Sequence, residues 1–306
     1  MFIKPLTCST LATFSFFVTF IAAAYAHIGN KYHATQQFNW SSIKPSTDLE
    51  YHDCDGEFKC ARLLLPLNWL NESDHRRVSI AIKKLPATVP DDDPSFAGTL
   101  FTNPGGPGLS GVDFLSRMGH RLQMMADKPD ARQYEILSFD PRGTGESRPR
   151  ADCFPGDPLS RSAMLLEMRG TWGLDKGSSS LAYTSAIRDN FGRRCKDADI
   201  QSHIMAYAST ASVARDMVEM LYKIDELRTR ETSKDSKEWP ELKTRNEAGV
   251  PRLQYIGFSY GTVLGNYFAS LFPGRVGRMI LDGVIDADDF ANGPVSTFKL
   301  IFPQTY

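Results

Sequence analysis

A G-x-S-x-G pattern centred on Ser259 is the part of this sequence best suited to chemistry. Residues 253–256 read as a strand and residues 261–271 as a helix, so the serine lies on the turn between them. Gly257 and Gly261 carry no side chains that would collide in such a sharp turn. The start of the helix offers free N–H groups and a dipole that favour an oxyanion. We predict that Ser259 is the nucleophile of an acyl-transfer reaction; the alternative is an inert turn serine.

An acyl-transfer site also needs donors for the oxyanion, each worth about 3 kcal/mol in the transition state. The backbone N–H of Tyr260 is the first candidate. The turn 103–108 follows an earlier predicted strand and offers a second. Its two prolines have no N–H, which leaves Gly105 and Gly106. We select Gly106. Taken alone, the segment would be read as a plain Gly/Pro turn; its combination with the serine turn favours the donor role.

Strand and helix patterns alternate along the chain, which predicts an α/β fold with a mostly parallel sheet and helices on both faces. A helix is expected from Ser209 or Thr210, where apolar residues recur at helical spacing. Residues 228–250 are dense in charge and are expected to form a solvated loop. The predicted strands are residues 62–67, 77–82, 99–102, 134–139, 253–256 and 276–281.

The periodicity becomes indistinct between the two halves of this pattern, which predicts an inserted, cap-like segment. The predicted domains are a signal peptide at 1–26, the first part of the core at 27–150, the cap-like insertion at 151–208, the nucleophile-bearing part of the core at 209–294 and a divergent tail at 295–306.

The first residues have the layout of a secretory signal peptide. Lys4 precedes an uncharged apolar stretch, residues 11–24, and residues 24–26 form a small-x-small cleavage site. The stretch is shorter than the roughly 20 apolar residues of a spanning helix, so an uncleaved anchor is the weaker reading. Sequons at Asn39 and Asn71 agree with export and predict glycosylation. We expect a secreted, extracellular protein with no membrane association after cleavage.

An even set of cysteines remains once Cys8 leaves with the signal peptide: Cys54, Cys60, Cys153 and Cys195. Cysteines pair in an oxidising compartment, and four of them allow three connectivities. We favour Cys54–Cys60 and Cys153–Cys195, because each pair then closes one region. Buried free thiols are the alternative.

Bulk composition excludes some classes of partner. The 306 residues are 42% hydrophobic and 23% charged, with a formal net charge of -1. No basic excess points to nucleic acid. We expect no metal and no cofactor, and a peptide or small amide or ester as the substrate.

Six strings stand out together: residues 60–67, 103–108, 140–147, 257–261, 272–276 and 281–284. In combination they resemble the secreted tripeptidyl aminopeptidases and proline iminopeptidase relatives within the α/β-hydrolase family. The resemblance covers roughly residues 50 to 293. It implies a cap over the active site and cleavage of peptides, or related amides and esters, near a free amino terminus. It also maps Ser259 to the nucleophile, with Gly106 and Tyr260 at the oxyanion hole.

A catalytic acid and a histidine should follow the serine in this fold. All six histidines precede Ser259, and we read Asp282 as structural. The tail 295–306 does not continue the family pattern. We therefore expect the chain as written to be nearly inactive. His120 and His203 are read as ordinary histidines rather than as displaced bases.

Two other functions stay open: a lipase or carboxylesterase, because the serine turn serves both, and a non-catalytic secreted binding protein on the same scaffold. Arg142 is expected to brace its turn rather than to contact substrate.

Overall fold

The computed structural model describes residues 38–170, 177–235 and 249–292. The predicted signal peptide and tail lie outside these residues. The chain divides into two units, Met1–Asn39 and Trp40–Tyr306. In the first, only Phe38 and the exposed sequon residue Asn39 are described. The account below concerns the second unit.

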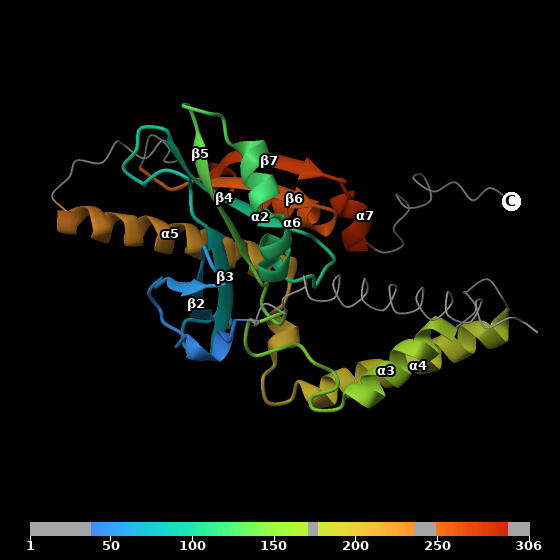
Figure 1. The fold of residues 1–306 in the computed structure, drawn as a ribbon. Coiled ribbons are helices and arrows are strands. Elements are labelled where there is room, and N and C mark those ends of the chain that lie inside the picture. Colours follow the sequence, from blue (N-terminus) through green and yellow to red (C-terminus); the bar gives the residue numbers. More distant parts are fainter. Residues whose placement is uncertain (1–37, 171–176, 236–248, 293–306) are drawn as a thin grey trace, which may run out of the picture. The chain divides into compact units, whose positions relative to one another are not determined.

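Within the described ranges, seven strands form one mixed sheet in the order β1-β2-β3-β5-β4-β6-β7 (Figure 1). Neighbouring strands from β5 to β7 are parallel, whereas β1, β2, β3 and β5 pair antiparallel. Five strands therefore run one way, and β1 and β3 run the other. The bounds are β1 His52–Cys54, β2 Phe58–Pro66, β3 Arg77–Leu85, β4 Phe96–Asn103, β5 Gln133–Phe139, β6 Leu253–Phe258 and β7 Val276–Asp282. The α/β architecture predicted from the sequence is confirmed.

The buried fraction of each strand follows its position in the sheet. Seven of the eight residues of β4 and six of the seven of β5 are buried, as expected for central strands covered on both faces. In contrast, β7 buries none of its residues and forms an edge of the sheet among the described residues. Strand β6, which leads into the turn at Ser259, thus lies between the central strand β4 and the edge strand β7.

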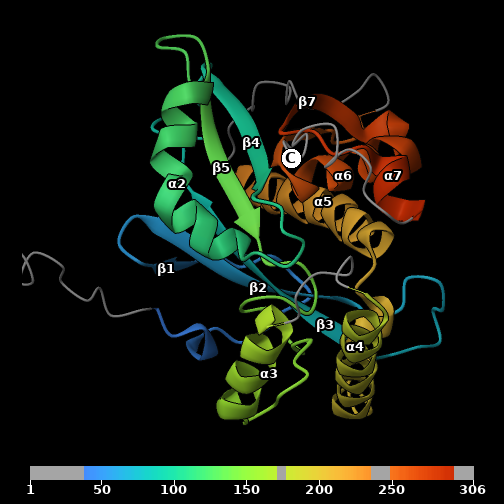
Figure 2. The same ribbon diagram turned by 90° about the vertical axis from the view of Figure 1, so that its right-hand side faces the viewer.

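Helices cover both faces of the sheet: α2 lies on one side, and α5 and α6 lie on the other (Figure 2). Ser110 caps α2, because its side chain accepts a hydrogen bond from the N–H of Asp113. In the described ranges no helix has the length and apolar character needed to cross a bilayer. The bounds are α2 Gly111–Ala126, α3 Pro158–Gly170, α4 Ser178–Ala198, α5 Thr210–Asp235, α6 Tyr260–Leu271 and α7 Ala287–Asn292, with short 3-10 turns η1 Trp40–Ser42, η2 Ile204–Tyr207 and η3 Pro273–Arg275.

The helix α5 begins where the sequence predicted, and Val213, Met217 and Met220 are buried in the core. The predicted loop at residues 228–250 is wrong in its first part, because α5 continues to residue 235. Arg228 is buried and binds Glu135, so a charge-dense stretch here supplies a buried ion pair. Residues 236–248 lie outside the described residues.

A buried charge cluster at the amino ends of β4 and β5 explains why Arg228 is ordered. Glu135 accepts hydrogen bonds from Arg228 at 2.8 Å, Lys84 at 2.9 Å and Thr99 at 2.6 Å. Arg228 also reaches Asp91 at 3.3 Å. Burial would raise the pKa of Glu135, but the charges of Lys84 and Arg228 and these hydrogen bonds outweigh it and lower the pKa to about 2.

The predicted cap-like segment forms the paired helices α3 and α4. Of their residues only Ile187 is buried, so the pair has almost no core of its own. The disulfide Cys153–Cys195 and a hydrogen bond from Tyr183 to Glu167 help to hold the pair. The carboxyl ends of β4 and β5 point toward these helices (Figure 2).

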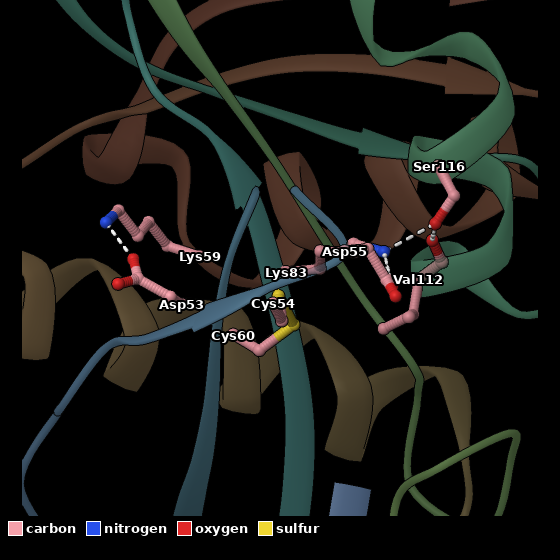
Figure 3. The surroundings of a disulfide bond; sticks show 8 residues. All are labelled: Asp53, Cys54, Asp55, Lys59, Cys60, Lys83, Val112 and Ser116. Carbon is pink, nitrogen blue, oxygen red and sulfur yellow. Dashed lines mark hydrogen bonds and ion pairs between the residues drawn. A yellow bond between two sulfur atoms is a disulfide. The ribbon is translucent and has the colours of Figure 1, made fainter. Parts of the chain in front are cut away.

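The second disulfide, Cys54–Cys60, also forms, so both predicted pairings are present. It closes a short loop over a buried lysine (Figure 3). The ammonium of Lys83 lies 2.6 Å from both Asp55 of this loop and Ser116 of α2, and 4.6 Å from the ring centre of Phe58.

Candidate active site

Ser259 is the single residue between the end of β6 at Phe258 and the start of α6 at Tyr260. Its backbone has φ 53° and ψ -123°, a conformation that non-glycine residues rarely adopt and that is strained. The residue is exposed, although its neighbours on both sides are at least partly buried. Among the described residues, no side chain forms a hydrogen bond with the hydroxyl of Ser259. The turn therefore presents a free hydroxyl at the carboxyl end of a parallel strand.

Close backbone contacts explain the two flanking glycines. A Cβ on Gly257 would lie 2.5 Å from the carbonyl oxygen of Gly261. A Cβ on Gly261 would lie 2.7 Å from the carbonyl oxygen of Asn103. Both distances are shorter than real Cβ contacts, so any larger residue would force the turn open.

Three hydrogen bonds connect the turn at Ser259 to neighbouring segments. The N–H of Ser259 donates to the carbonyl of Asp282 at 3.0 Å. The hydroxyl of Thr262 donates to the carbonyl of Ser259 at 2.6 Å and accepts from the N–H of Ile285 at 3.0 Å. These contacts tie the strained residue to the segment that follows β7.

The glycine-rich turn after β4 packs directly on the serine turn. A Cβ on Gly105 would lie 2.5 Å from the carbonyl oxygen of Phe258, 2.9 Å from the nitrogen of Tyr260 and 3.0 Å from the Cβ of Ser259. The segments 103–108 and 257–261, far apart in sequence, therefore meet at one place.

The two candidate donors in that turn differ. The N–H of Gly105 donates to the side chain of Asn103 at 2.9 Å, and Gly105 is buried. Gly106 is exposed, and within the described residues its N–H has no recorded partner. The N–H of Tyr260, at the first position of α6, likewise has none recorded there. The N–H of Gly105 is therefore already occupied, which leaves those of Gly106 and Tyr260 as the candidate donors.

The side chain of Tyr260 points into the protein rather than toward a substrate. Its hydroxyl lies 2.7 Å from that of Thr210, at the start of α5, and its ring packs on Phe290 with centroids 5.4 Å apart. Burial raises the pKa of this tyrosine. The backbone of Tyr260 is thus fixed by anchors on two other helices, which the sequence patterns did not reveal.

The histidines do not complete a triad within the described residues. His52 lies in β1, His75 in the connection from β2 to β3, and His203 just before η2; all three are exposed. His120 lies on α2, with Nε2 2.8 Å from Glu57. None of the four is recorded in contact with Ser259. His27 and His33 lie outside the described residues.

The two aspartates after the serine have positions that suit structural roles. Asp282 is exposed, and it is its carbonyl that binds Ser259. Asp286 accepts the N–H groups of Asp288 and Asp289 and so caps α7.

Asp140 holds the neighbouring turns together. Its buried carboxylate accepts from Ser110 at 2.7 Å, from the N–H of Val112 at 3.1 Å and from the N–H of Glu146 at 2.6 Å. Burial raises the pKa of this group more than the hydrogen bonds lower it. An aspartate directly after a strand, before a glycine-rich turn, is the signal in the sequence for this role.

Arg142 is fully occupied inside the protein. It forms a two-pronged pair with buried Asp216, at 2.8 and 2.5 Å, and donates to the carbonyl of Leu67 at 2.7 Å. Asp216 also accepts from Trp69 at 2.9 Å. This arginine braces its turn, as expected from the sequence.

A cavity of about 590 Å³ lies between the glycine turns and the helices α3 and α4. Gly108 and residues 143–145 line it from the core. From the other side it is lined mainly by apolar side chains, including Phe154, Met164, Leu165, Met168 and Phe191. A cavity of this size next to the glycine turns can accept an apolar group of a ligand.

Comparison with known proteins agrees with this geometry. The family model described as alpha/beta hydrolase fold matches residues 98–303. Serine protease Hip1 of Mycobacterium tuberculosis is 28% identical over 227 residues, which is 74% of this chain and 36% of that protein. Tripeptidyl aminopeptidase of Streptomyces lividans is 24% identical over 246 residues, 78% of this chain and 38% of that protein.

Carboxylesterase B of M. tuberculosis is 28% identical over 162 residues, 52% of this chain and 28% of that protein. The chain thus spans little more than a third of the length of the serine protease and of the aminopeptidase, and less of the carboxylesterase. Among solved structures, juvenile hormone epoxide hydrolase of Bombyx mori matches with a TM-score of 0.33 at 14% identity, over 67% of this chain and 32% of that one. Cfl2 of Burkholderia cenocepacia matches with a TM-score of 0.35 at 12% identity, over 78% and 46%.

Proposed function

The chain belongs to the α/β-hydrolase family, and from that premise we propose that it is a secreted serine hydrolase of the aminopeptidase type with Ser259 as its nucleophile. The observation that carries this proposal is the meeting of two turns: an exposed serine at φ 53° faces the glycine turn after β4. Relatives named as a serine protease and a tripeptidyl aminopeptidase support the peptidase reading.

The proposed reaction proceeds through an acyl-enzyme. The oxygen of Ser259 bonds to the scissile carbonyl carbon while a base takes the hydroxyl proton. The N–H groups of Tyr260 and Gly106 stabilise the negative oxygen of the tetrahedral intermediate. The carbon–nitrogen bond then breaks, and the amine leaves with a proton. Water attacks the remaining ester, which frees the acid and restores the serine.

We propose that the chain as given reacts slowly. A serine hydroxyl is a weak nucleophile without an adjacent base, and none of the described histidines contacts it. Triad variants of serine proteases retain about 10³ to 10⁴-fold catalysis over water from the oxyanion hole and substrate binding. The same residual level is expected here.

A fluorophosphonate probe tests the nucleophile. We expect a slow adduct, located on Ser259 by peptide mass spectrometry and absent from Ser259→Ala. Ser270 is a matched control, because it is exposed on the same helix and lies outside the serine turn; Ser270→Ala should react like the parent. An adduct on another serine would refute the assignment. Labelling at the rate of an active serine hydrolase would refute only the low activity.

Esterase activity is the second candidate, favoured by the relative named carboxylesterase B. The oxyanion donors serve esters and amides alike, so substrate choice must be measured. We expect short peptides with a free amino terminus to release amine faster than the same peptides with an acetylated terminus. Equal rates, or turnover of simple esters alone, would favour the esterase. A folded chain that binds such peptides without turnover or probe labelling would favour a binding protein.

Secretion is supported by the two disulfides and by the exposed sequon at Asn71. Its side chain accepts from the N–H of Ser73 in the connection between β2 and β3. Expression in a secreting eukaryotic host should yield a glycoprotein in the medium, and Asn71→Gln should remove one glycan. An intracellular, unglycosylated product would contradict this part of the proposal.

A further inference from the structure

The connection from β4 to α2 carries the proposed oxyanion donor Gly106, and a buried carboxylate holds its far end. Ser110 is the last residue of this connection, and its hydroxyl donates to Asp140 at 2.7 Å. We infer that Asp140 is a positioning residue of the hydrolase, because its carboxylate fixes the connection in the path that directs the N–H of Gly106 toward the oxyanion. This inference rests on the proposed function, since the position of Gly106 matters only if Ser259 reacts.

The near end of the connection is anchored in the sheet and on the serine turn. Asn103, the last residue of β4, pairs in register with Gly257 of β6. Gly105 packs against the serine turn, where an added Cβ would lie 3.0 Å from the Cβ of Ser259. Gly106 therefore lies between this anchor and the far end at Ser110.

Both oxygens of the Asp140 carboxylate are occupied. Oδ1 accepts the hydroxyl of Ser110 and the N–H of Val112, the latter at 3.1 Å. Oδ2 accepts the N–H of Glu146 at 2.6 Å. Asp140 directly follows β5 and is fully buried. Hydrogen bonds to a carboxylate are stronger than those to a neutral acceptor, so this group can hold the start of α2 in place.

Two glycines let neighbouring segments approach this carboxylate. A Cβ on Gly111, the first residue of α2, would overlap the carbonyl oxygen of Phe139 at the end of β5. A Cβ on Gly145 would overlap the carboxylate of Asp140 itself. The start of α2 and the turn after β5 are therefore in direct contact with the end of β5, and Asp140 joins them by hydrogen bonds.

Small displacements of an oxyanion donor have large effects on a rate. A shift of about 1 Å in a reacting arrangement can slow the reaction about 10²-fold. An oxyanion donor also contributes only when it is already directed at the place where the charge develops. Loss of the contact between Ser110 and Asp140 should therefore slow the reaction of a bound ligand and change its affinity little.

The reaction of the full chain with a fluorophosphonate probe, followed by mass spectrometry at several probe concentrations, separates the maximal rate of adduct formation from the apparent affinity. Ser110→Ala should lower the maximal rate about tenfold or more, because alanine cannot donate to Asp140. Ser110→Thr keeps a hydroxyl and should recover most of the rate. The apparent affinity for the probe should change little in both variants.

Asp140→Asn tests the carboxylate itself. An amide has one acceptor oxygen, so its NH₂ group must face either the N–H of Glu146 or the two donors from Ser110 and Val112. The maximal rate should again fall about tenfold or more. In the double variant with Ser110→Ala, the loss should be smaller than the product of the two single losses, because both changes act through one contact.

Glu135→Gln is the matched control. Glu135 is a buried carboxylate within β5, and its partners Lys84 and Arg228 lie at the amino ends of the strands. This variant should lose stability and keep the maximal rate of the parent. Circular dichroism under the conditions of the assay verifies that each variant is folded.

The outcomes separate this inference from the proposed function. An adduct on Ser259 that forms at the same maximal rate in the parent, in Ser110→Ala and in Asp140→Asn would overturn the inference and leave the proposed function standing. Equal slowing in Glu135→Gln would also overturn it, because the loss would then follow stability alone. An adduct on another serine, or none in the parent, would refute the proposed function and this inference with it.

Discussion

The two ends of the parallel strands differ in exposure and in the kind of group that surrounds the key residue. At the carboxyl ends, Ser259 is exposed and strained, and backbone groups from distant segments surround it. At the amino ends, Glu135 is buried and its partners are side chains of opposite charge. Ligands of open α/β sheets bind at the carboxyl ends of the strands. The comparison teaches that the strained end is available for chemistry while the other end contributes rigidity.

Removing the buried cation should have the largest effect on stability. Arg228→Met leaves Glu135 with Lys84 as its remaining cation in a buried place. Breaking a buried ion pair in this way typically destabilises by about 3–5 kcal/mol. Urea unfolding should show this loss.

Arg230→Met is the matched control on the same helix. Arg230 is 47% exposed and lies 3.5 Å from Asp48. An exposed pair contributes about 1 kcal/mol or less. Equal losses in the two variants would break the comparison, because they would mean that burial of the charge cluster adds nothing.

At the opposite end, Gly105→Ala should slow the fluorophosphonate reaction. The added Cβ would lie 2.9 Å from the nitrogen of Tyr260, which we propose as an oxyanion donor. Loss of one oxyanion donor typically lowers the rate about 10² to 10³-fold. The rate of adduct formation by mass spectrometry measures it.

Gly108→Ala is its control in the same turn. Gly105 and Gly108 both have positive φ, at 98° and 94°, but a Cβ on Gly108 would meet nothing within 4 Å. Backbone strain is therefore common to both variants, and only Gly105→Ala closes the site. Equal slowing in both would show that strain alone, and not the close approach, controls reactivity.

Acid should weaken the amino-end cluster. The pKa of Glu135 falls from 4.5 to about 2 on folding. Its stabilisation is therefore complete above about pH 4.5 and is lost as the pH falls toward 2, by up to about 3 kcal/mol. Urea unfolding of the parent and of Glu135→Gln at pH 7, 4 and 3 measures the difference.

Asp91 makes the Glu135→Gln comparison necessary. Burial and the nearby Glu135 raise the pKa of Asp91, so it titrates in the opposite sense. The advantage of the parent over Glu135→Gln should shrink as the pH falls. An advantage that stays constant from pH 7 to 3 would show that the ion pairs of Glu135 do not stabilise the fold.

The smallest effect is expected at the support of the serine turn. Thr262→Val keeps the shape but removes the hydroxyl that binds both Ser259 and Ile285, which leaves the partly buried N–H of Ile285 unpaired. The loss should be about 1–2 kcal/mol in urea unfolding. Thr262→Ser keeps the hydroxyl and should stay closer to the parent; the reverse order would mean that the methyl group, not the hydrogen bonds, supports the turn.

Local patterns predicted much of this architecture. Alternating strand and helix signals placed β2 to β7, α5 and α6, because apolar periodicity reports which faces are buried. Counting cysteines and favouring pairs that each close one region selected both disulfides. The glycine spacing around Ser259 predicted the sharp turn, since steric contacts there act between residues close in sequence.

Long-range side-chain pairing could not be read from the sequence. Arg228 belongs to a charge-dense stretch, which composition alone assigns to solvent, yet Glu135 lies 93 positions earlier and binds it. Similarly, the choice between Gly105 and Gly106 as donor depends on where the side chain of Asn103 turns. Such contacts become visible only when the distant segments are placed in space.

The loop closed by Cys54–Cys60 has a consequence for how the protein would respond to reducing agents. Its cysteines are 6 positions apart, and the loop holds Asp55 against the buried ammonium of Lys83. The cross-link keeps that carboxylate at a high effective concentration, as a short tether does for a ligand. Reduction of the disulfide would release the loop that carries Asp55. The buried ammonium of Lys83 would then lose a counter-ion.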